Sequence, residues 1–100
     1  MSENTRGQHN WTFLSNHSHV LLCLADNSEM RMRDIAQKVG ITERAVQKIV
    51  ADLTEAGYID RIKDGRCNRY QVHRDKHLRH PIEAHRVIED LIRLIDPENL

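Results

Sequence analysis

The chain has 100 residues and a mass of 11.7 kDa, which is room for one domain. Its 15 lysines and arginines balance 15 aspartates and glutamates, so the formal net charge is zero. This balance excludes a uniformly basic protein that coats nucleic acid and an acidic tail. The apolar share of 39% is enough for a core, and the few aromatic residues (one Trp, two Tyr, one Phe) make that core aliphatic.

Cysteine usage and apolar run length bear on the compartment. Cys23 and Cys67 lie outside any CxxC motif, so we expect no disulfide framework and a reducing, cytoplasmic location. The longest apolar run, residues 20–25, has six residues and is too short for a membrane span or a signal-peptide core. The polar residues 1–10 predict an N-terminal tail.

The first predicted helix covers residues 17–25. The Ser-Asn pair at 15–16 provides its cap, and the polar residues 26–28 provide its stop. Its apolar positions share one face. Residues 30–32 (Met-Arg-Met) then alternate apolar and polar, which predicts a strand of three residues.

Two further helices follow with a glycine between them. The second covers 33–39, and Gly40 stands where a left-handed residue ends a helix. The third covers 43–56 between a Thr42 cap and Gly57. Apolar residues recur on it at spacings of three and four: Ala45, Val46, Ile49, Val50, Leu53 and Ala56.

These two helices have the components of a helix-turn-helix. Ala36 is small where the helices would cross, and Gly40 permits the sharp turn. Ile41 would fill the corner, while Val46 and Ile49 pack back onto the earlier helix. The N-terminal residues of the later helix are then free to enter a major groove of DNA.

A change to strand-like patterning predicts a hairpin. Residues 58–63 and 68–73 are separated by Asp-Gly-Arg-Cys, and Asp-Gly is a strong hairpin signal. Ile59 and Ile62 have opposite parity, so the sequence does not decide which is better buried. Tyr70 is expected in the core.

The last predicted helix begins at Pro81, a favoured first position, and ends near residues 96–97. Its apolar band is broad: Ile82, Val87, Ile88, Leu91, Ile92, Leu94 and Ile95. Such a band exceeds a one-sided stripe, which favours a dimer interface over packing on the chain's own core. The expected interface residues are Trp11, Phe13, Leu14, Ile88, Leu91, Ile92 and Ile95.

Three segments carry a family resemblance: residues 34–46 (DIAQKVGITERAV), 53–59 (LTEAGYI) and 65–70 (GRCNRY). Together they resemble the winged helix-turn-helix regulators of bacteria and archaea, closest to their ArsR-like and MarR-like groups. The resemblance covers about residues 12–73, and residues 53–59 are its most specific part. It implies a mainly α fold with a small β-hairpin wing: a tail at 1–10, a DNA-binding domain at 11–80 and a C-terminal dimerisation helix at 81–100.

The resemblance also implies a function. A homodimeric transcriptional regulator, more a repressor than an activator, would bind double-stranded DNA sequence-specifically, with no cofactor and no enzymatic activity. The recognition helix would contribute Thr42, Glu43, Arg44, Gln47 and Lys48. The wing would contact backbone or minor groove through Arg61, Lys63, Arg66, Asn68 and Arg69. Without the helix-turn-helix resemblance, the same charged residues are interpreted as a solvated surface. Thr42 is then only a helix cap, and Glu43 is an acid that interacts favourably with the helix dipole in the first turn.

Other chemistries have weaker support. Seven histidines invite a metal site, but the sequence has no CxC motif and the histidines after residue 72 are irregularly spaced, so we expect none. Cys67 beside Arg66 could hold a thiolate, although an inert exposed thiol is favoured. No P-loop, GxSxG or HExxH motif supports an enzyme.

Two alternatives and one open point remain at this stage. A winged helix can serve as a protein-interaction module or bind structured RNA instead of an operator. The resemblance also leaves room for a small-molecule effector between the terminal helices and the DNA-binding core, whose identity the sequence does not give.

The net charge of zero is the sum of two segments of opposite charge. Residues 58–81 hold seven Lys/Arg against three Asp, and residues 82–100 hold two Arg against five Asp/Glu.

Overall fold

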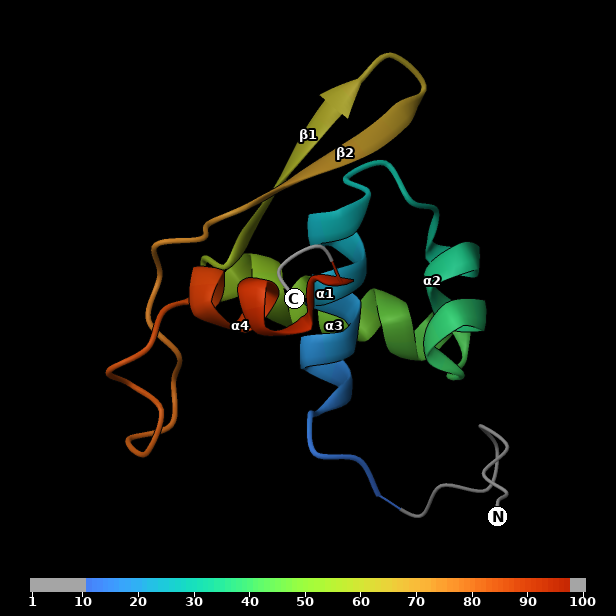
Figure 1. Cartoon of the computed structure of the whole chain (residues 1–100). Coiled ribbons are helices and arrows are strands. Elements are labelled where there is room, and N and C mark those ends of the chain that lie inside the picture. Colours follow the sequence, from blue (N-terminus) through green and yellow to red (C-terminus); the bar gives the residue numbers. More distant parts are fainter. Residues whose placement is uncertain (1–10, 98–100) are drawn as a thin grey trace.

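The described residues, 11–97, of the computed structural model form four helices and one hairpin (Figure 1). The predicted tail, residues 1–10, lies outside them. In chain order the elements are α1 (Asn16–Asp26), α2 (Met32–Val39), α3 (Glu43–Glu55), β1 (Ile59–Asp64), β2 (Cys67–Val72) and α4 (Ile88–Ile95). The expected mainly α fold with a hairpin wing is confirmed. No helix within the described part of the chain is long and apolar enough to cross a membrane.

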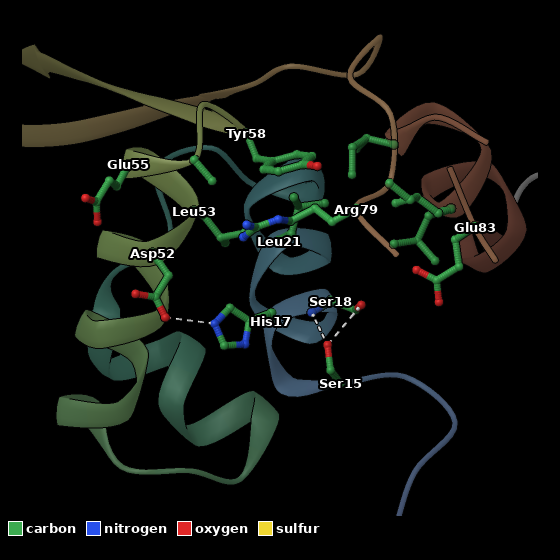
Figure 2. Close-up of a pocket in the computed structure, with 14 residues that line it drawn as sticks. Ser15, His17, Ser18, Leu21, Asp52, Leu53, Glu55, Tyr58, Arg79 and Glu83 are labelled. Atoms are coloured by element: carbon green, nitrogen blue, oxygen red, sulfur yellow. Dashed lines mark hydrogen bonds and ion pairs between the residues drawn. The ribbon is translucent and has the colours of Figure 1, made fainter. Parts of the chain in front are cut away.

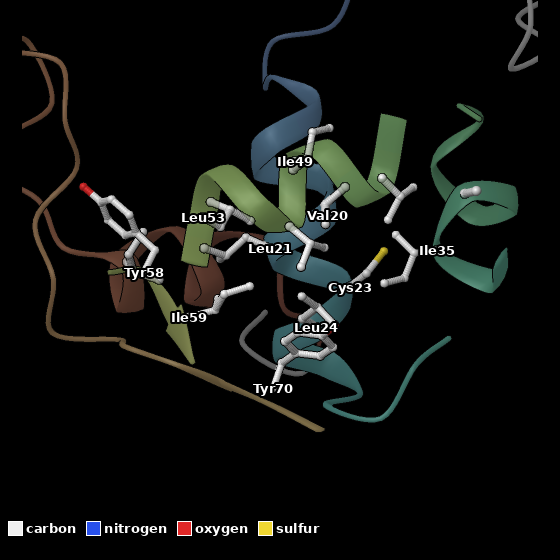
Figure 3. Packing of buried hydrophobic residues seen from close by; sticks show 14 residues of the cluster. Val20, Leu21, Cys23, Leu24, Ile35, Ile49, Leu53, Tyr58, Ile59 and Tyr70 are labelled. Carbon is white, nitrogen blue, oxygen red and sulfur yellow. The ribbon is translucent and has the colours of Figure 1, made fainter. Parts of the chain in front are cut away.

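The first three helices form where their caps and apolar spacing predict. Ser15 caps α1 by accepting a hydrogen bond from the Ser18 backbone N–H at 3.2 Å. Gly40 follows α2 in the left-handed conformation, with φ of 90°. The buried faces of the three helices meet in one core: Val20, Leu21, Cys23, Leu24, Ile35, Ala36, Val46, Ile49, Val50 and Leu53 (Figure 3).

The base of the hairpin closes this core. Tyr58, Ile59 and Tyr70 are buried against the helices (Figure 3). The structure settles the parity left open by the sequence: Ile59 is fully buried, whereas Ile62 is on the opposite face and only half-buried. The strands pair antiparallel from Ile59↔Val72 to Asp64↔Cys67. The connecting turn is therefore two residues, 65–66, and is shorter than the predicted four-residue separation.

The predicted strand at residues 30–32 is wrong. Asn27 forms a turn there instead, because its side chain accepts from the Glu29 N–H and its carbonyl accepts from the Met30 N–H. Met32 already begins α2. The only link from this loop to the hairpin among the described backbone hydrogen bonds is Tyr70 N–H to the Ser28 carbonyl, at 3.0 Å.

The last helix begins at Ile88, and its predicted start at Pro81 is wrong. Residues 81–86 form successive turns, and the Leu78 N–H donates to the Arg86 carbonyl at 2.9 Å. His77 and Val87 pair in an antiparallel bridge, which holds Val87 extended. Residues 86–87 thus pair with residues 77–78 of the connector. Asp90 caps α4 by accepting a hydrogen bond from the Val87 N–H. Ile82, counted in the apolar band, is 77% exposed.

Candidate nucleic-acid interface

The turn between α2 and α3 fixes the direction of α3. The N–H groups of Gly40 and Ile41 both donate to the Ala36 carbonyl, which ends α2 abruptly. Thr42 then caps α3 by accepting from the Ala45 N–H at 3.0 Å. With Val46 and its neighbours buried, the opposite face of α3 points to solvent.

That exposed face carries the residues predicted for base reading. Glu43 and Arg44 lie in its first turn, and Gln47 follows one turn later. Ala51 and Thr54 continue the same exposed surface. The sequence reasoning did not select these two, although helical spacing of four and seven from Gln47 places them beside it.

A groove of about 910 Å³ lies between α3 and the wing. Gln47, Ala51 and Thr54 line it from α3, and Arg61, Asn68 and Tyr70 line it from the hairpin. Cross-strand partners share a face of a hairpin, so the pairs Arg61↔Tyr70 and Lys63↔Asn68 place all four residues on the face toward this groove. The structure therefore brings Gln47 together with Arg61 and Asn68.

Two other predicted wing residues have different positions. Arg66 is exposed in the turn at the far end of the hairpin, where Gly65 has φ of 65°. Arg69 is exposed on the opposite hairpin face, across from Ile62. Cys67 is exposed beside this turn, while burial raises the pKa of the Cys23 thiol.

Lys48 is exposed but is tied to its own helix. Its Nζ lies 3.4 Å from Asp52 Oδ1, and Asp52 Oδ2 lies 3.0 Å from His17 Nε2. The hydrogen bond from His17 is the main cause that holds the pKa of Asp52 below its usual value, with Lys48 adding to it. The side chain of Lys48 remains 77% exposed.

A second cavity, of about 490 Å³, lies between α1, the end of α3, the connector after the wing and α4 (Figure 2). Its apolar lining residues are Leu21, Leu53, Tyr58, Leu78, Ile88 and Leu91. The polar side chains that line it are Ser15, His17, Ser18, Asp52, Glu55, Arg79 and Glu83. Among the described residues, no carboxylate forms an ion pair with Arg79.

Apolar residues near the two ends of the described chain differ in exposure. Ile88 is 3% exposed and packs in the protomer's own core, which corrects its assignment to a dimer interface. Leu91 and Ile92 are half-buried, and Leu94 and Ile95 are exposed. Leu14 is half-buried, while Trp11 and Phe13 are exposed and stack edge-to-face with ring centroids 5.1 Å apart.

No group of three or more histidine, cysteine, aspartate or glutamate side chains could hold a metal ion within residues 11–97. Several histidines have other partners there. His73 contacts Asp60 at 2.7 Å, and His77 Nδ1 lies 2.8 Å from the Ala84 carbonyl.

Residues 15–60 match the family model for winged helix-turn-helix DNA-binding domains. Solved structures with a similar fold include the PcaV transcriptional regulator of Streptomyces coelicolor in complex with its natural ligand, which is 22% identical with a TM-score of 0.51, over 59% of this chain and 44% of that one. Lactococcus lactis ZitR in complex with DNA is 24% identical with a TM-score of 0.52, over 68% and 48%. The zinc-dependent MarR-family regulator AdcR, in its Zn(II)-bound state, is 23% identical with a TM-score of 0.50, over 64% and 47%.

The chain thus has a winged helix-turn-helix fold, which it shares with transcriptional regulators that include the MarR-family AdcR. It spans somewhat less than half the length of each of these three solved chains. A comparison with curated protein sequences finds no match. The matched family model is one of DNA-binding domains, and the PcaV and AdcR structures are of transcriptional regulators.

Proposed function

We propose that the chain is a repressor that binds a two-fold symmetric DNA operator as a homodimer. In each protomer α3 enters a major groove, and the wing follows the adjacent backbone or minor groove. Bound protein then blocks access to the promoter. This role requires the compartment that holds the DNA, which we propose to be the cytoplasm.

The groove between α3 and the wing is the main support for this proposal. It combines an amide that can pair with adenine, Gln47, with a cation and a second amide from the hairpin, Arg61 and Asn68. Arg44 precedes Gln47 by about one helical turn on the exposed face, and its guanidinium is suited to guanine or phosphate. A protein-docking surface would instead favour an apolar or uniformly acidic recognition face.

Equilibrium binding to duplex DNA tests this role. Fluorescence anisotropy with a duplex selected from a random DNA pool, compared with a scrambled duplex, should show sequence-specific binding that weakens steeply with salt. Gln47→Ala should cost about 1–3 kcal/mol at one base position and relax preference there. Arg86→Ala, in the turn before α4, is the matched control and should bind like wild type. Equal affinity for a structured RNA competitor would favour the RNA-binding alternative.

The second cavity supports an effector site as an addition to this role. The cavity has apolar lining residues and one guanidinium, Arg79, which among the described residues forms no ion pair with the lining carboxylates Asp52, Glu55 and Glu83. This guanidinium suits a small molecule that has an apolar body and one anionic group. The PcaV structure contains that protein's natural ligand. Isothermal titration with benzoate as a probe should detect binding to wild type and not to Arg79→Ala, whereas equal binding to both would remove Arg79 from the site.

A further inference from the structure

Three polar side chains connect the first turn of α1 to the exposed face of α3. Figure 2 shows the contact between His17 and Asp52, which lie on different helices. The other carboxylate oxygen of Asp52 accepts a hydrogen bond from Lys48. One carboxylate oxygen of Asp52 therefore contacts an imidazole beside the second cavity, and the other contacts a cation on the recognition helix.

Lys48 is held loosely enough to leave Asp52. The Nζ–Oδ1 distance of 3.4 Å is long for a charge-assisted hydrogen bond. The base precedes the acid by four residues, which is the less favourable order for such a pair on a helix. Exposed pairs of this kind contribute little to stability, so a nearby phosphate can compete for the ammonium group.

The charge of His17 decides how strongly Asp52 competes. Imidazole is the side chain that changes charge between about pH 5 and 8. A charged His17 neutralises the Asp52 carboxylate and weakens its attraction for Lys48, whereas a neutral His17 leaves the full carboxylate charge to Lys48.

Charged side chains of both signs lie near these residues. Glu55 on α3, Arg79 on the connector and Glu83 in the following turn line the same cavity as His17. Arg44 stands one turn before Lys48 on α3. His17 is the one histidine among the residues that line this cavity.

We propose that His17 and Asp52 are positioning residues for Lys48, and that protonation of His17 releases Lys48 toward a DNA phosphate. Affinity for DNA then rises as the pH falls. The proposal rests on the proposed function, because it needs α3 to lie against DNA.

The test is the pH dependence of DNA binding at constant ionic strength. Anisotropy with a duplex selected from a random DNA pool, at about pH 8 and about pH 5.5, gives the gain in affinity on acidification for wild type, His17→Gln and His85→Gln. His85 is exposed in the turn at 81–86 and serves as the matched histidine control. The gain in affinity on acidification should be about two- to fivefold smaller for His17→Gln than for wild type, whereas His85→Gln should keep the wild-type gain. In a Lys48→Met background, His17→Gln should have no further effect.

The outcomes separate the possible roles. Equal losses in His17→Gln and His85→Gln, or an effect of His17→Gln that persists in Lys48→Met, would overturn the proposal. A purely structural role would lower the Tm of His17→Gln while leaving its pH-dependent gain intact, which also overturns it. Wild type that binds no duplex at either pH would refute the proposed function itself, and this inference with it.

Discussion

Two arginines of the wing differ in which hairpin face they occupy. Arg61 lies on the face that lines the groove beside α3, and Arg69 lies on the other face. We predict that Arg61→Ala weakens binding to all DNA sequences alike and lowers the salt slope by about one, as expected for one lost phosphate contact. Arg69→Ala is the matched control and should have a smaller effect. A larger effect of Arg69→Ala would indicate that the opposite face of the wing contacts DNA.

Gly40 is the residue on which the turn between α2 and α3 depends. Its φ of 90° lies in the region where a side chain is strained. Gly40→Ala should therefore lower the free energy of unfolding by about 1–2 kcal/mol. Urea denaturation measures this value, with Gln37→Ala on the exposed face of α2 as control. A change within about 0.5 kcal/mol, which is usual for surface substitutions, would show that the turn tolerates an L-residue.

The Glu89 carboxylate adds side-chain contacts to the backbone pairing that attaches α4 to the connector. Glu89 accepts from Arg74 at 2.9 Å and from Arg93 at 3.0 Å. The hydrogen bond from Arg74, then that from Arg93, hold the pKa of Glu89 below its usual 4.5. Because this pKa is lower in the folded state, the stabilisation is present above about pH 4.5 and is lost as the pH falls through the folded-state value.

Glu89→Gln should remove that part of the acid sensitivity. Thermal unfolding monitored by circular dichroism at about pH 7 and about pH 3.5 should show a smaller loss of Tm on acidification in the variant than in wild type. Glu29→Gln, in the exposed loop before α2, provides the comparison for general charge effects. Parallel Tm losses in wild type and Glu89→Gln would mean that the two arginine contacts do not stabilise the fold.

The sequence predicts those elements whose signals are local. Ser15, Thr42 and Gly40 mark helix ends through their own backbone and side-chain chemistry, and the three helices form where they indicate. The start of α4 could not be predicted in this way. It depends on pairing between residues 77–78 and 86–87, which are brought together only by the turns at 81–86.

In the candidate site, too, local patterns predict some features and other features depend on long-range packing. The exposed face of α3 follows from helical periodicity, so Arg44 and Gln47 could be selected from sequence. The separation of Arg61 from Arg69 follows from strand register, which the sequence leaves undecided at Ile59 and Ile62. Asp52 contacts both Lys48 and His17. Its contact with His17 requires α1 and α3 to be packed together, and no spacing along the chain predicts that contact.

At the scale of the whole molecule, the exposed apolar end of α4 predicts self-association. Leu94 is 73% exposed beside the half-buried Leu91. Leu94→Lys should turn a dimer into a monomer in sedimentation equilibrium at tens of micromolar protein. Ile82→Lys changes an equally exposed residue outside α4 and should remain dimeric. A monomeric wild type would contradict the proposed dimer.

Selection of bound sequences from a pool of random DNA duplexes tests the central claim most directly. Two α3 helices related by a two-fold axis should enrich an inverted repeat whose half-sites are about 10 base pairs apart, and Gln47→Ala should relax one position in each half. A pool that remains unenriched after binding, or wild type and Gln47→Ala that enrich identical sequences, would contradict the assignment of α3 as the sequence-reading helix.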